Sequence, residues 1–280
     1  MATTTSERVM QPQRPRPRFR TAQVRRVDRL SPRMVRVTLA GDELQGFELP
    51  TPTQHVKLII PEPGQSKPVL PDPSVPRGAS VPGQPRPLMR TYTVRRYDPA
   101  AVELDIDFAL HVDGPASDWA AQTKPGDVAA LAGPGGRPYR PDLDVSWYFI
   151  AGDESALPAM GTLLDVLPAS IEAHVLTEVQ KPDEELEWHS KAQLRASWLH
   201  RVSDSAKPGT ELVDAVSQIK RPAGEGRVWL ACEASMMRRI RKHLVEAWQL
   251  DPSAIVTRGY WKEGEVNYPD HDYGETDGDR

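Results

Sequence analysis

Residues 147–158 read Trp-Tyr-Phe-Ile-Ala-Gly-Asp-Glu-Ser-Ala-Leu-Pro, and within them one hydrophobic pattern gives way to another. The continuous apolar run at 147–151 is typical of a strand covered on both faces, as in a parallel sheet. Directly after it, apolar residues recur at helical spacing from Leu157 to Leu167, and Pro158 falls in the first turn, where its missing N–H costs nothing. A buried strand that leads straight into a helix predicts an α/β domain.

The same alternation continues toward the C-terminus. Further strands are expected at about 173–179, 198–202, 228–232 and 255–260, with helices at about 183–195, 209–220 and 234–248. Strands and helices in alternation predict a parallel, doubly wound sheet. Residues 142–265 are therefore expected to form one α/β domain, and residues 266–280 an acidic C-terminal tail.

Upstream of residue 141 the hydrophobic period is two. Val35, Val37 and Leu39 alternate with polar residues, as do the apolar residues of 102–112. This pattern is typical of antiparallel strands with one buried face, and it predicts an antiparallel β-domain over 18–141. A Pro-rich loop is expected at 61–87, where there is no periodicity, and a disordered tail at 1–17, where large apolar side chains are almost absent.

Composition limits the possible partners and the compartment. A chain of 280 residues suits two domains, and 39% hydrophobic residues are enough for two cores. A net charge of −4 gives no general affinity for nucleic acid, so no nucleic-acid partner is expected. Cys232 is the single cysteine, and neither an 18-residue apolar run nor a signal-peptide pattern is found. We expect a cytoplasmic monomer without a membrane partner.

The tetrapeptide Arg90-Thr91-Tyr92-Thr93 follows the Pro-rich loop. It resembles the Arg-x-Tyr-(Ser/Thr) strand that binds flavin in the ferredoxin-reductase superfamily, and within it the siderophore-interacting proteins. An arginine fork can bind a pyrophosphate oxygen pair, an aromatic ring can pack beside the isoalloxazine, and a hydroxyl or N–H can reach the polar edge of the flavin. Taken alone, the tetrapeptide is equally consistent with an ordinary strand that carries a surface arginine.

A second motif follows about twenty residues later, where residues 111–120 read His-Val-Asp-Gly-Pro-Ala-Ser-Asp-Trp-Ala. A turn into a short helix directs free backbone N–H groups and a small hydroxyl to one place, which is typical of a phosphate site. The segment is similar to the stretch that binds the FAD pyrophosphate in the same family, although Ser117 as a plain helix cap is the alternative. The two motifs together imply that FAD is held by Arg90, Thr91, Tyr92, Thr93, His111, Gly114, Pro115, Ala116, Ser117 and Trp119.

Two further segments resemble this family, residues 151–159 and residues 258–264. The first lies at the carboxyl end of a strand, where α/β sheets bind ligands, so a nicotinamide cofactor is expected at Gly152, Asp153, Glu154 and Ser155. A Gly-x-Gly-x-x-Gly fingerprint is missing there, and a purely structural turn is the alternative. In the second segment, Tyr260 and Trp261 are expected to cover the flavin ring, or otherwise to anchor a buried C-terminal strand.

The resemblance covers about residues 18–265 and implies an FAD-dependent flavoprotein oxidoreductase. It implies that 18–141 form a six-stranded antiparallel flavin-binding barrel and that 142–265 form a doubly wound NAD(P)H-binding domain. Such an enzyme reduces ferric siderophore complexes and releases Fe(II), with electrons from NADH, NADPH or reduced ferredoxin. It implies that Lys57, Arg137 and Lys262 attract the anionic ferric siderophore to the open side of the flavin. Glu178, at the end of the second α/β strand, favours NADH because it repels a 2′-phosphate. Because electrons pass through the flavin, no catalytic side chain and no protein-bound metal are expected.

Three alternatives stay open from sequence. A general flavin or flavodoxin reductase has the same FAD and nicotinamide sites and differs only on the open side of the flavin. A non-enzymatic siderophore-binding protein keeps the barrel without flavin, which the intact Arg90 and Ser117 motifs disfavour. An interaction module built on the Pro-rich loop is disfavoured for the same reason.

Overall fold

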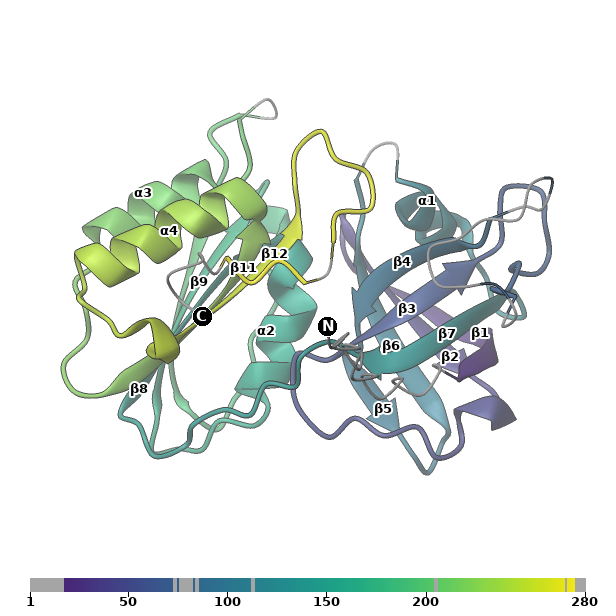
Figure 1. Cartoon of the computed structure of the whole chain (residues 1–280), viewed down its shortest axis with the longest axis horizontal. Coiled ribbons are helices and arrows are strands. Elements are labelled where there is room, and N and C mark those ends of the chain that lie inside the picture. Colours follow the sequence, from purple (N-terminus) through teal and green to yellow (C-terminus); the bar gives the residue numbers. More distant parts are fainter. Residues whose placement is uncertain are drawn as a thin grey trace, which may run out of the picture.

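The computed structural model describes residues 18–72, 75, 83, 86–111, 114–203, 206–269 and 271–274 of the chain. The expected N-terminal tail, part of the Pro-rich loop and the last residues of the acidic C-terminus lie outside the described residues. The described part forms two domains side by side, an antiparallel β-domain and an α/β domain (Figure 1). Among the described residues, no helix is long and apolar enough to cross a membrane.

The first domain is a curled antiparallel sheet. Its strands are β1 (Phe19–Ser31), β2 (Met34–Ala40), β3 (His55–Ile60), β4 (Leu88–Thr93), β5 (Arg96–Asp98), β6 (Glu103–Ala109) and β7 (Val128–Gly135), in the order β4-β3-β7-β1-β2-β6-β5. The short helices η1 (Asp42–Leu44) and α1 (Pro115–Gln122) complete it. Val35, Val37 and Leu39 of β2 are buried as the alternation predicts, because they line the core that the curled sheet encloses.

The predicted antiparallel β-domain is confirmed, with seven strands in the described sheet where six were expected, and the sheet does not close into a barrel. The chain changes its pairing partner at Val94, whose N–H donates to Gln54 O, while the next N–H, that of Arg95, donates to Asp105 O. The chain thus passes from the β3 side of the sheet to the β6 side and forms β4 and β5 as separate strands. Among the described residues the sheet has seven strands, and β4 and β5 remain its two edges.

The second domain has the predicted parallel sheet. Its strands are β8 (Trp147–Asp153), β9 (Glu172–Val179), β10 (Gln193–His200), β11 (Gly226–Glu233) and β12 (Ile255–Trp261), in the order β10-β9-β8-β11-β12. The helices are α2 (Leu157–Leu164), α3 (Thr210–Gln218) and α4 (Ala234–Glu246), with the short helices η2 (Glu154–Ala156), η3 (Pro182–Glu184) and η4 (Pro252–Ala254). Every residue of β8 is buried, as its continuous apolar run predicts.

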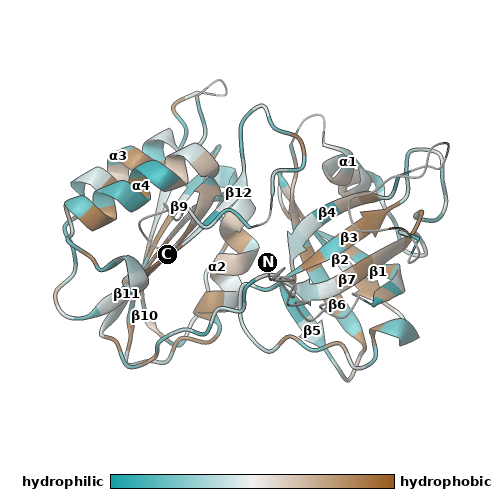
Figure 2. Ribbon diagram, viewed as in Figure 1, coloured by the Kyte–Doolittle hydropathy of each residue, from teal (hydrophilic) through white to brown (hydrophobic). Residues whose placement is uncertain are grey.

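The helices cover both faces of this sheet. The α2 residues pack on one face, and the α3 and α4 residues pack with the core of the other. Figure 2 shows hydrophobic strands behind α3 and α4, whose outward residues are largely hydrophilic. Because the chain leaves β8 toward β9 and later returns to β11 on the other side, the carboxyl ends of β8 and β11 form the point where the strand order reverses.

The predicted helix at 183–195 is wrong. Only η3 forms between β9 and β10, and β10 already begins at Gln193. Leu186 and Trp188 are two residues apart instead of at helical spacing, and both pack into a cluster between the domains. The Trp188 ring stacks on that of Trp198, with 5.7 Å between the ring centroids. These contacts keep the segment that carries Leu186 and Trp188 extended.

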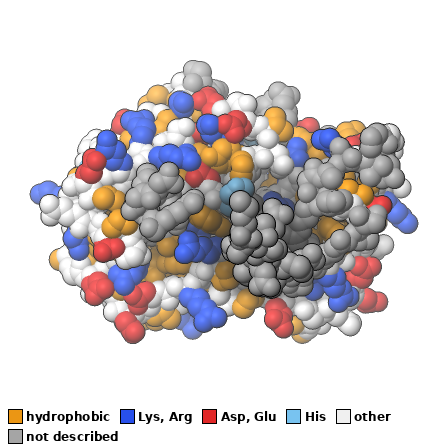
Figure 3. Space-filling view, viewed as in Figure 1, with side chains coloured by type: hydrophobic (Ala, Val, Ile, Leu, Met, Phe, Trp, Pro, Cys, Tyr) orange, Lys and Arg blue, Asp and Glu red, His pale blue; other side chains and the backbone are white. Residues whose placement is uncertain are grey.

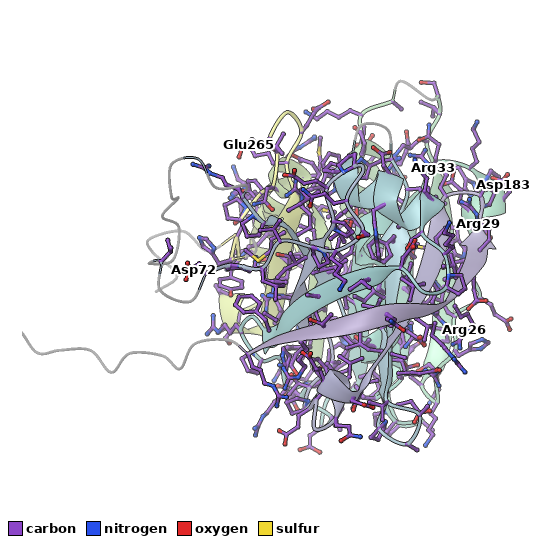
Figure 4. The ribbon with its side chains drawn as sticks, turned by 90° about the vertical axis from the view of Figure 1, so that its right-hand side faces the viewer. Arg26, Arg29, Arg33, Asp72, Asp183 and Glu265 are labelled. Atoms are coloured by element: carbon purple, nitrogen blue, oxygen red, sulfur yellow. The ribbon has the colours of Figure 1, made fainter. Side chains whose placement is uncertain are left out.

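This domain junction is a small hydrophobic core. Met34, Leu157 and Val179 are buried in it, together with partly buried residues that include Trp188 and Trp198. Polar contacts surround it: Arg33 Nη1 donates to Gln180 Oε1 at 2.7 Å, and Arg95 pairs with Asp165 at 2.6 Å. Figure 4 shows Arg33 on the same side of the molecule as Asp183, which follows β9. The junction joins both domains.

Substitution of Leu157 tests the contribution of this junction. Leu157 is 4% exposed, so Leu157→Ala removes buried apolar contacts on both domains and should lower the free energy of unfolding by about 2 to 5 kcal/mol in urea denaturation. Leu143→Ala is the control, because Leu143 is 45% exposed and its loss should change stability by less than about 0.5 kcal/mol. Equal effects of the two substitutions would contradict a stabilising junction.

Candidate functional site

The strand that carries the Arg-Thr-Tyr-Thr motif, β4, is an edge of the antiparallel sheet. It pairs with β3, which places Thr91 opposite Lys57 and Thr93 opposite His55. Lys57 Nζ donates to Thr91 Oγ1 at 2.6 Å. Arg90 is half-buried and its Nη1 donates to Met89 O at 2.9 Å, so the guanidinium lies along the strand and keeps further donors.

Tyr92 and Thr93 point to opposite sides of β4. The Tyr92 ring packs 4.3 Å from the Phe108 ring, between centroids, and burial raises the pKa of Tyr92 to about 12. The phenol is therefore neutral at physiological pH. Thr93 is buried on the other side, where its side chain lies within hydrogen-bonding reach of the Tyr260 hydroxyl of β12. The motif thus borders both its own core and the α/β domain.

The second motif surrounds the start of α1. Ser117 Oγ accepts from His111 N and donates to His111 O, both at 2.9 Å, so this hydroxyl closes the turn on its own backbone. The first intrahelical N–H is that of Asp118, which donates to Gly114 O, so the earlier amides of Ala116 and Ser117 lie at the open end of the helix. Gly114 has no room for a Cβ, which would lie 2.1 Å from the His111 ring. The backbone, rather than the Ser117 hydroxyl, is what remains for a phosphate.

Pro115 and Trp119 differ in exposure. Pro115 is exposed at the first position of α1, and Trp119 is half-buried with its ring 5.8 Å from that of Phe108. Trp119 therefore packs on the core of the β-domain. Its contact with a cofactor stays a prediction.

At the carboxyl end of β8, the Asp153 carboxylate is fully buried and collects four donors. Oδ1 accepts from Ser155 N at 3.0 Å and from Ser155 Oγ at 2.5 Å. Oδ2 accepts from Glu233 N at 3.0 Å and from Trp261 Nε1 at 2.9 Å. Burial, reinforced by the negative charge of Glu154, raises the pKa of Asp153 to about 7. Asp153 therefore joins the ends of β8, β11 and β12.

Two further buried carboxylates lie at neighbouring strand ends, and sequence reasoning missed their role. Glu178 is 0% exposed; it accepts from Gly209 N and Leu212 N at the start of α3 and from Arg201 Nε, at 2.7, 3.0 and 2.8 Å. Glu233 accepts from Ser235 N and Met236 N at the start of α4. An acidic residue between a strand and a helix was the available signal for Glu233.

The expectation that Glu178 repels a 2′-phosphate is wrong. Both its oxygens are used inside the protein, and Arg201 compensates its charge. Arg201 also pairs with Glu154 at 2.5 Å, so this arginine lies between two carboxylates. No sequence pattern predicted the role of Arg201, because its partners Glu178 and Glu154 are 23 and 47 residues away along the chain.

Gly152 is explained by packing of the protein itself. A Cβ there would lie 2.6 Å from Ala231 O and 2.6 Å from the Ala156 Cβ. Such a distance is far inside van der Waals contact, so β8, β11 and η2 can approach one another only at a glycine. The assignment of Gly152, Asp153, Glu154 and Ser155 to a nicotinamide cofactor stays a prediction.

The basic residues expected around the flavin each contact another part of the chain. Lys57 bonds Thr91, Lys262 pairs with Glu265, and the Arg137 guanidinium lies 5.9 Å from the centre of the Tyr273 ring. The hydrogen bond to Glu265 raises the pKa of Lys262, which therefore stays cationic. Figure 3 shows basic and acidic side chains interspersed over the visible face of the α/β domain. The described residues of that face therefore form no continuous basic patch, and an anion would be attracted there only by individual basic side chains.

The β-domain carries the kinds of groups that bind FAD. The half-buried Arg90 guanidinium and the open amides of α1 are suited to two phosphates, and a neutral, half-buried Tyr92 ring is suited to an aromatic ring system. Because β4 is an edge strand, one row of its backbone groups is also turned away from the sheet.

Asp153 should make stability depend on pH. Its folded-state pKa of about 7 lies well above that of an ordinary aspartate, so folding favours the protonated form. This contribution is present below about pH 4 and lost as pH rises through 7. The free energy of unfolding of the parent, minus that of Asp153→Asn, should therefore fall between pH 5 and pH 8 in urea denaturation. A difference that stays constant with pH would show that Asp153 does not titrate in this range.

Comparison with known proteins identifies the family. Residues 23–138 match the siderophore-interacting FAD-binding domain, and residues 145–264 match the siderophore-interacting protein domain. The chain is 31% identical over 241 residues to the ferric vibriobactin reductase of Vibrio cholerae, covering 84% of this chain and 86% of the relative. It is 33% identical over 249 residues to the NADPH-dependent ferric-chelate reductase of Escherichia coli, covering 87% and 93%.

A solved structure supports the same relationship. The crystal structure of a siderophore utilization protein from T. fusca is 35% identical and superimposes with a TM-score of 0.80, covering 91% of this chain and 97% of that one. Both halves of the sequence and the arrangement of the two domains therefore agree with one group of proteins. The chain belongs to the siderophore-interacting protein family.

Proposed function

We propose that this chain is an FAD-dependent reductase that converts the Fe(III) of a ferric siderophore to Fe(II), with electrons from NAD(P)H. The observation that carries the proposal is the match of both halves of the chain to the siderophore-interacting family, with the flavin motif on the open edge strand β4. The two relatives described above are named as reductases of ferric complexes. We expect the protein to be a cytoplasmic monomer.

The FAD site is proposed on the β-domain. Arg90 and the first amides of α1 hold the pyrophosphate, Tyr92 packs beside the ring system, and Thr91 and Thr93 line its polar edge. Bound FAD supplies the chemistry of accepting a hydride and releasing single electrons. Tyr260 and Trp261 are proposed to cover the flavin ring from the α/β side, with Trp261 held by its hydrogen bond to Asp153.

The protein contributes position and charge to the reduction, and needs no acid, base or nucleophile. Lys57, Arg137 and Lys262 are proposed to attract an anionic ferric complex and hold it near the flavin. Fe(II) binds the hard oxygen ligands of a siderophore more weakly than Fe(III), so one-electron reduction is enough to release the metal. The iron is the substrate in this proposal.

The electron donor is proposed as NAD(P)H, without a preference for NADH. That preference depended on Glu178, which is occupied inside the protein. Reduced ferredoxin is a second candidate. Anaerobic titration of the oxidised flavoprotein with NADH, NADPH and reduced ferredoxin measures directly which donor reduces the flavin.

Arg90→Ala tests the flavin site. The protein should purify yellow with bound FAD, and loss of a charged hydrogen bond to the pyrophosphate should weaken FAD binding by about 1.5 to 3 kcal/mol. The measurement is the dissociation constant of FAD, from fluorescence titration of deflavinated protein. An unchanged constant would remove Arg90 from the site, and a colourless parent protein would leave a siderophore-binding protein as the better reading.

Lys57→Ala and Lys262→Ala test the substrate site. Each should raise the KM for an anionic ferric siderophore roughly fivefold at low salt, with less effect at high salt, because salt screens partly exposed charges. The measurement is Fe(II) release, trapped by a ferrous chelator, with FAD content determined in each variant.

Lys242→Ala is the matched control, because Lys242 is exposed on α4 and should leave the KM unchanged. Reduction of a small neutral dye should also be unaffected in all three variants. If both test variants release iron like the parent at every salt concentration, a general flavin reductase is the better assignment.

A further inference from the structure

The strand β10 is an open edge of the parallel sheet. In the order β10-β9-β8-β11-β12 it pairs with β9 alone, and among the described residues no strand pairs with its other side. The outer edge of β12, at the other end of the sheet, is in contact with the C-terminal segment that carries Asp272 and Tyr273. An edge strand presents a row of backbone N–H and C=O groups that can pair with another strand.

The hydrogen bonds at the two ends of β10 show which residues bond to β9. Gln193 N donates to Ile171 O at 2.9 Å, and Arg201 N donates to Val179 O at 3.2 Å. The register with β9 is continuous between these two points, so the odd-numbered residues direct their backbone groups to β9.

The even-numbered residues therefore point their backbone groups away from the sheet. Successive residues of a strand alternate in this direction, so the amides and carbonyls of Leu194, Ala196 and Trp198 face outward. These three residues form the row that a further strand would meet.

The edge carries few of the features that usually prevent such pairing. It has no proline and no lysine, and its pairing with β9 has no bulge. Its one arginine, Arg195, already pairs with Glu172 of β9. Ala196 and Ser197, in the middle of the strand, are small and exposed. Another strand can therefore approach the middle of β10 without a bulky or unpaired charged side chain in its way.

Apolar side chains lie on both sides of this exposed centre. Leu194 packs with the core that contains the α2 residues, and Trp198 packs into the domain junction. Both are half-buried, whereas Ala196 between them is exposed. The face of β10 on the α2 side therefore has two large apolar residues that keep part of their surface for a further contact.

The sequence of β10 is complementary to itself in one antiparallel register. A two-fold axis at Ala196 places Leu194 opposite Trp198 of a second copy, and Trp198 opposite its Leu194. On the other face, Arg195 lies opposite Ser197, so no like charges meet directly. Aromatic and aliphatic residues directly opposite each other stabilise antiparallel strands, and each pair of outward residues exchanges two hydrogen bonds.

The neighbouring registers fit less well. An axis at Arg195 places this arginine opposite its own copy, and like charges in that position are destabilising. An axis at Ser197 places Leu194 opposite His200, so both contacts between leucine and tryptophan are lost. The axis at Ala196 is thus the register that the side chains favour.

We propose that β10 is a self-association surface, and that it pairs antiparallel with β10 of a second copy of this chain about a two-fold axis at Ala196. The two parallel sheets then form one continuous sheet. A two-fold contact uses the same edge of both copies, so the assembly closes as a dimer. The paired segment is short, so we expect a dissociation constant of about 1 μM to 1 mM and a monomer in dilute solution.

Sedimentation equilibrium of the purified chain, at concentrations that span this interval, measures the association. Ala196→Pro should weaken it by about tenfold or more, because proline removes an outward N–H that β9 does not use. Ala196→Lys should have a similar effect, because it places two like charges at the axis. Ala100→Lys is the matched control, since Ala100 is exposed between β5 and β6 of the other domain, and it should leave the association unchanged.

Cross-linking tests the register. The Cα atoms of a hydrogen-bonded antiparallel pair lie about 5.5 Å apart, a distance that a disulfide can span. Oxidised glutathione should therefore convert Ala196→Cys, but not Ser197→Cys, into a covalent dimer. The native Cys232 is buried, so it does not compete for the oxidant.

Three results would overturn the inference. The first is a parent chain that stays monomeric over the whole interval, and the second is a dimer that Ala196→Pro and Ala196→Lys weaken no more than Ala100→Lys does. The third is cross-linking of Ser197→Cys in preference to Ala196→Cys. If the proline variant does not fold, the lysine and cysteine variants decide. Neither measurement involves flavin reduction or a siderophore, so the inference stands or falls independently of the proposed reductase activity.

Discussion

The buried Asp153 carboxylate holds together the end of the α/β sheet at which the nicotinamide cofactor is expected. It receives donors from η2, from the last residue of β11 and from Trp261 of β12, so three strand ends share one pair of oxygens. A buried carboxylate of this kind has a high free energy when ionised, and the four donors offset part of that cost. Its position fixes Trp261, and with it the end of β12 that borders the β-domain.

The same arrangement decides where an anionic ligand can bind. Helix starts at the carboxyl edge of a parallel sheet ordinarily attract phosphates, because their first amides are unpaired. Here Asp153, Glu178 and Glu233 already fill this role, and Arg201 compensates two of the neighbouring charges. The arginines at the side of the sheet have partners of their own: Arg238 of α4 pairs with Asp272, and the Arg258 guanidinium of β12 lies over the Tyr273 ring.

Local patterns predicted what depends on local interactions. The run at 147–151 identified β8, and the alternation of Val35, Val37 and Leu39 identified β2, because burial on one face or two leaves a period in the sequence. The extended segment before β10 was wrongly predicted as a helix, because the contacts that keep it extended, with Trp198 and with the β-domain residue Met34, form only in the folded protein. The roles of Glu178 and Asp272 were equally invisible, since each depends on an arginine brought near only by the fold.

The two aromatic residues at the end of β12 contact both the β-domain and the buried carboxylate of the α/β domain. Because successive strand residues point to opposite sides, Tyr260 reaches Thr93 of the proposed flavin strand, while Trp261 reaches Asp153. The outer edge of the same strand carries the segment with Asp272 and Tyr273. The end of β12 is therefore in contact both with β4 of the antiparallel sheet, through Tyr260, and with the Asp153 carboxylate at the end of β8, through Trp261.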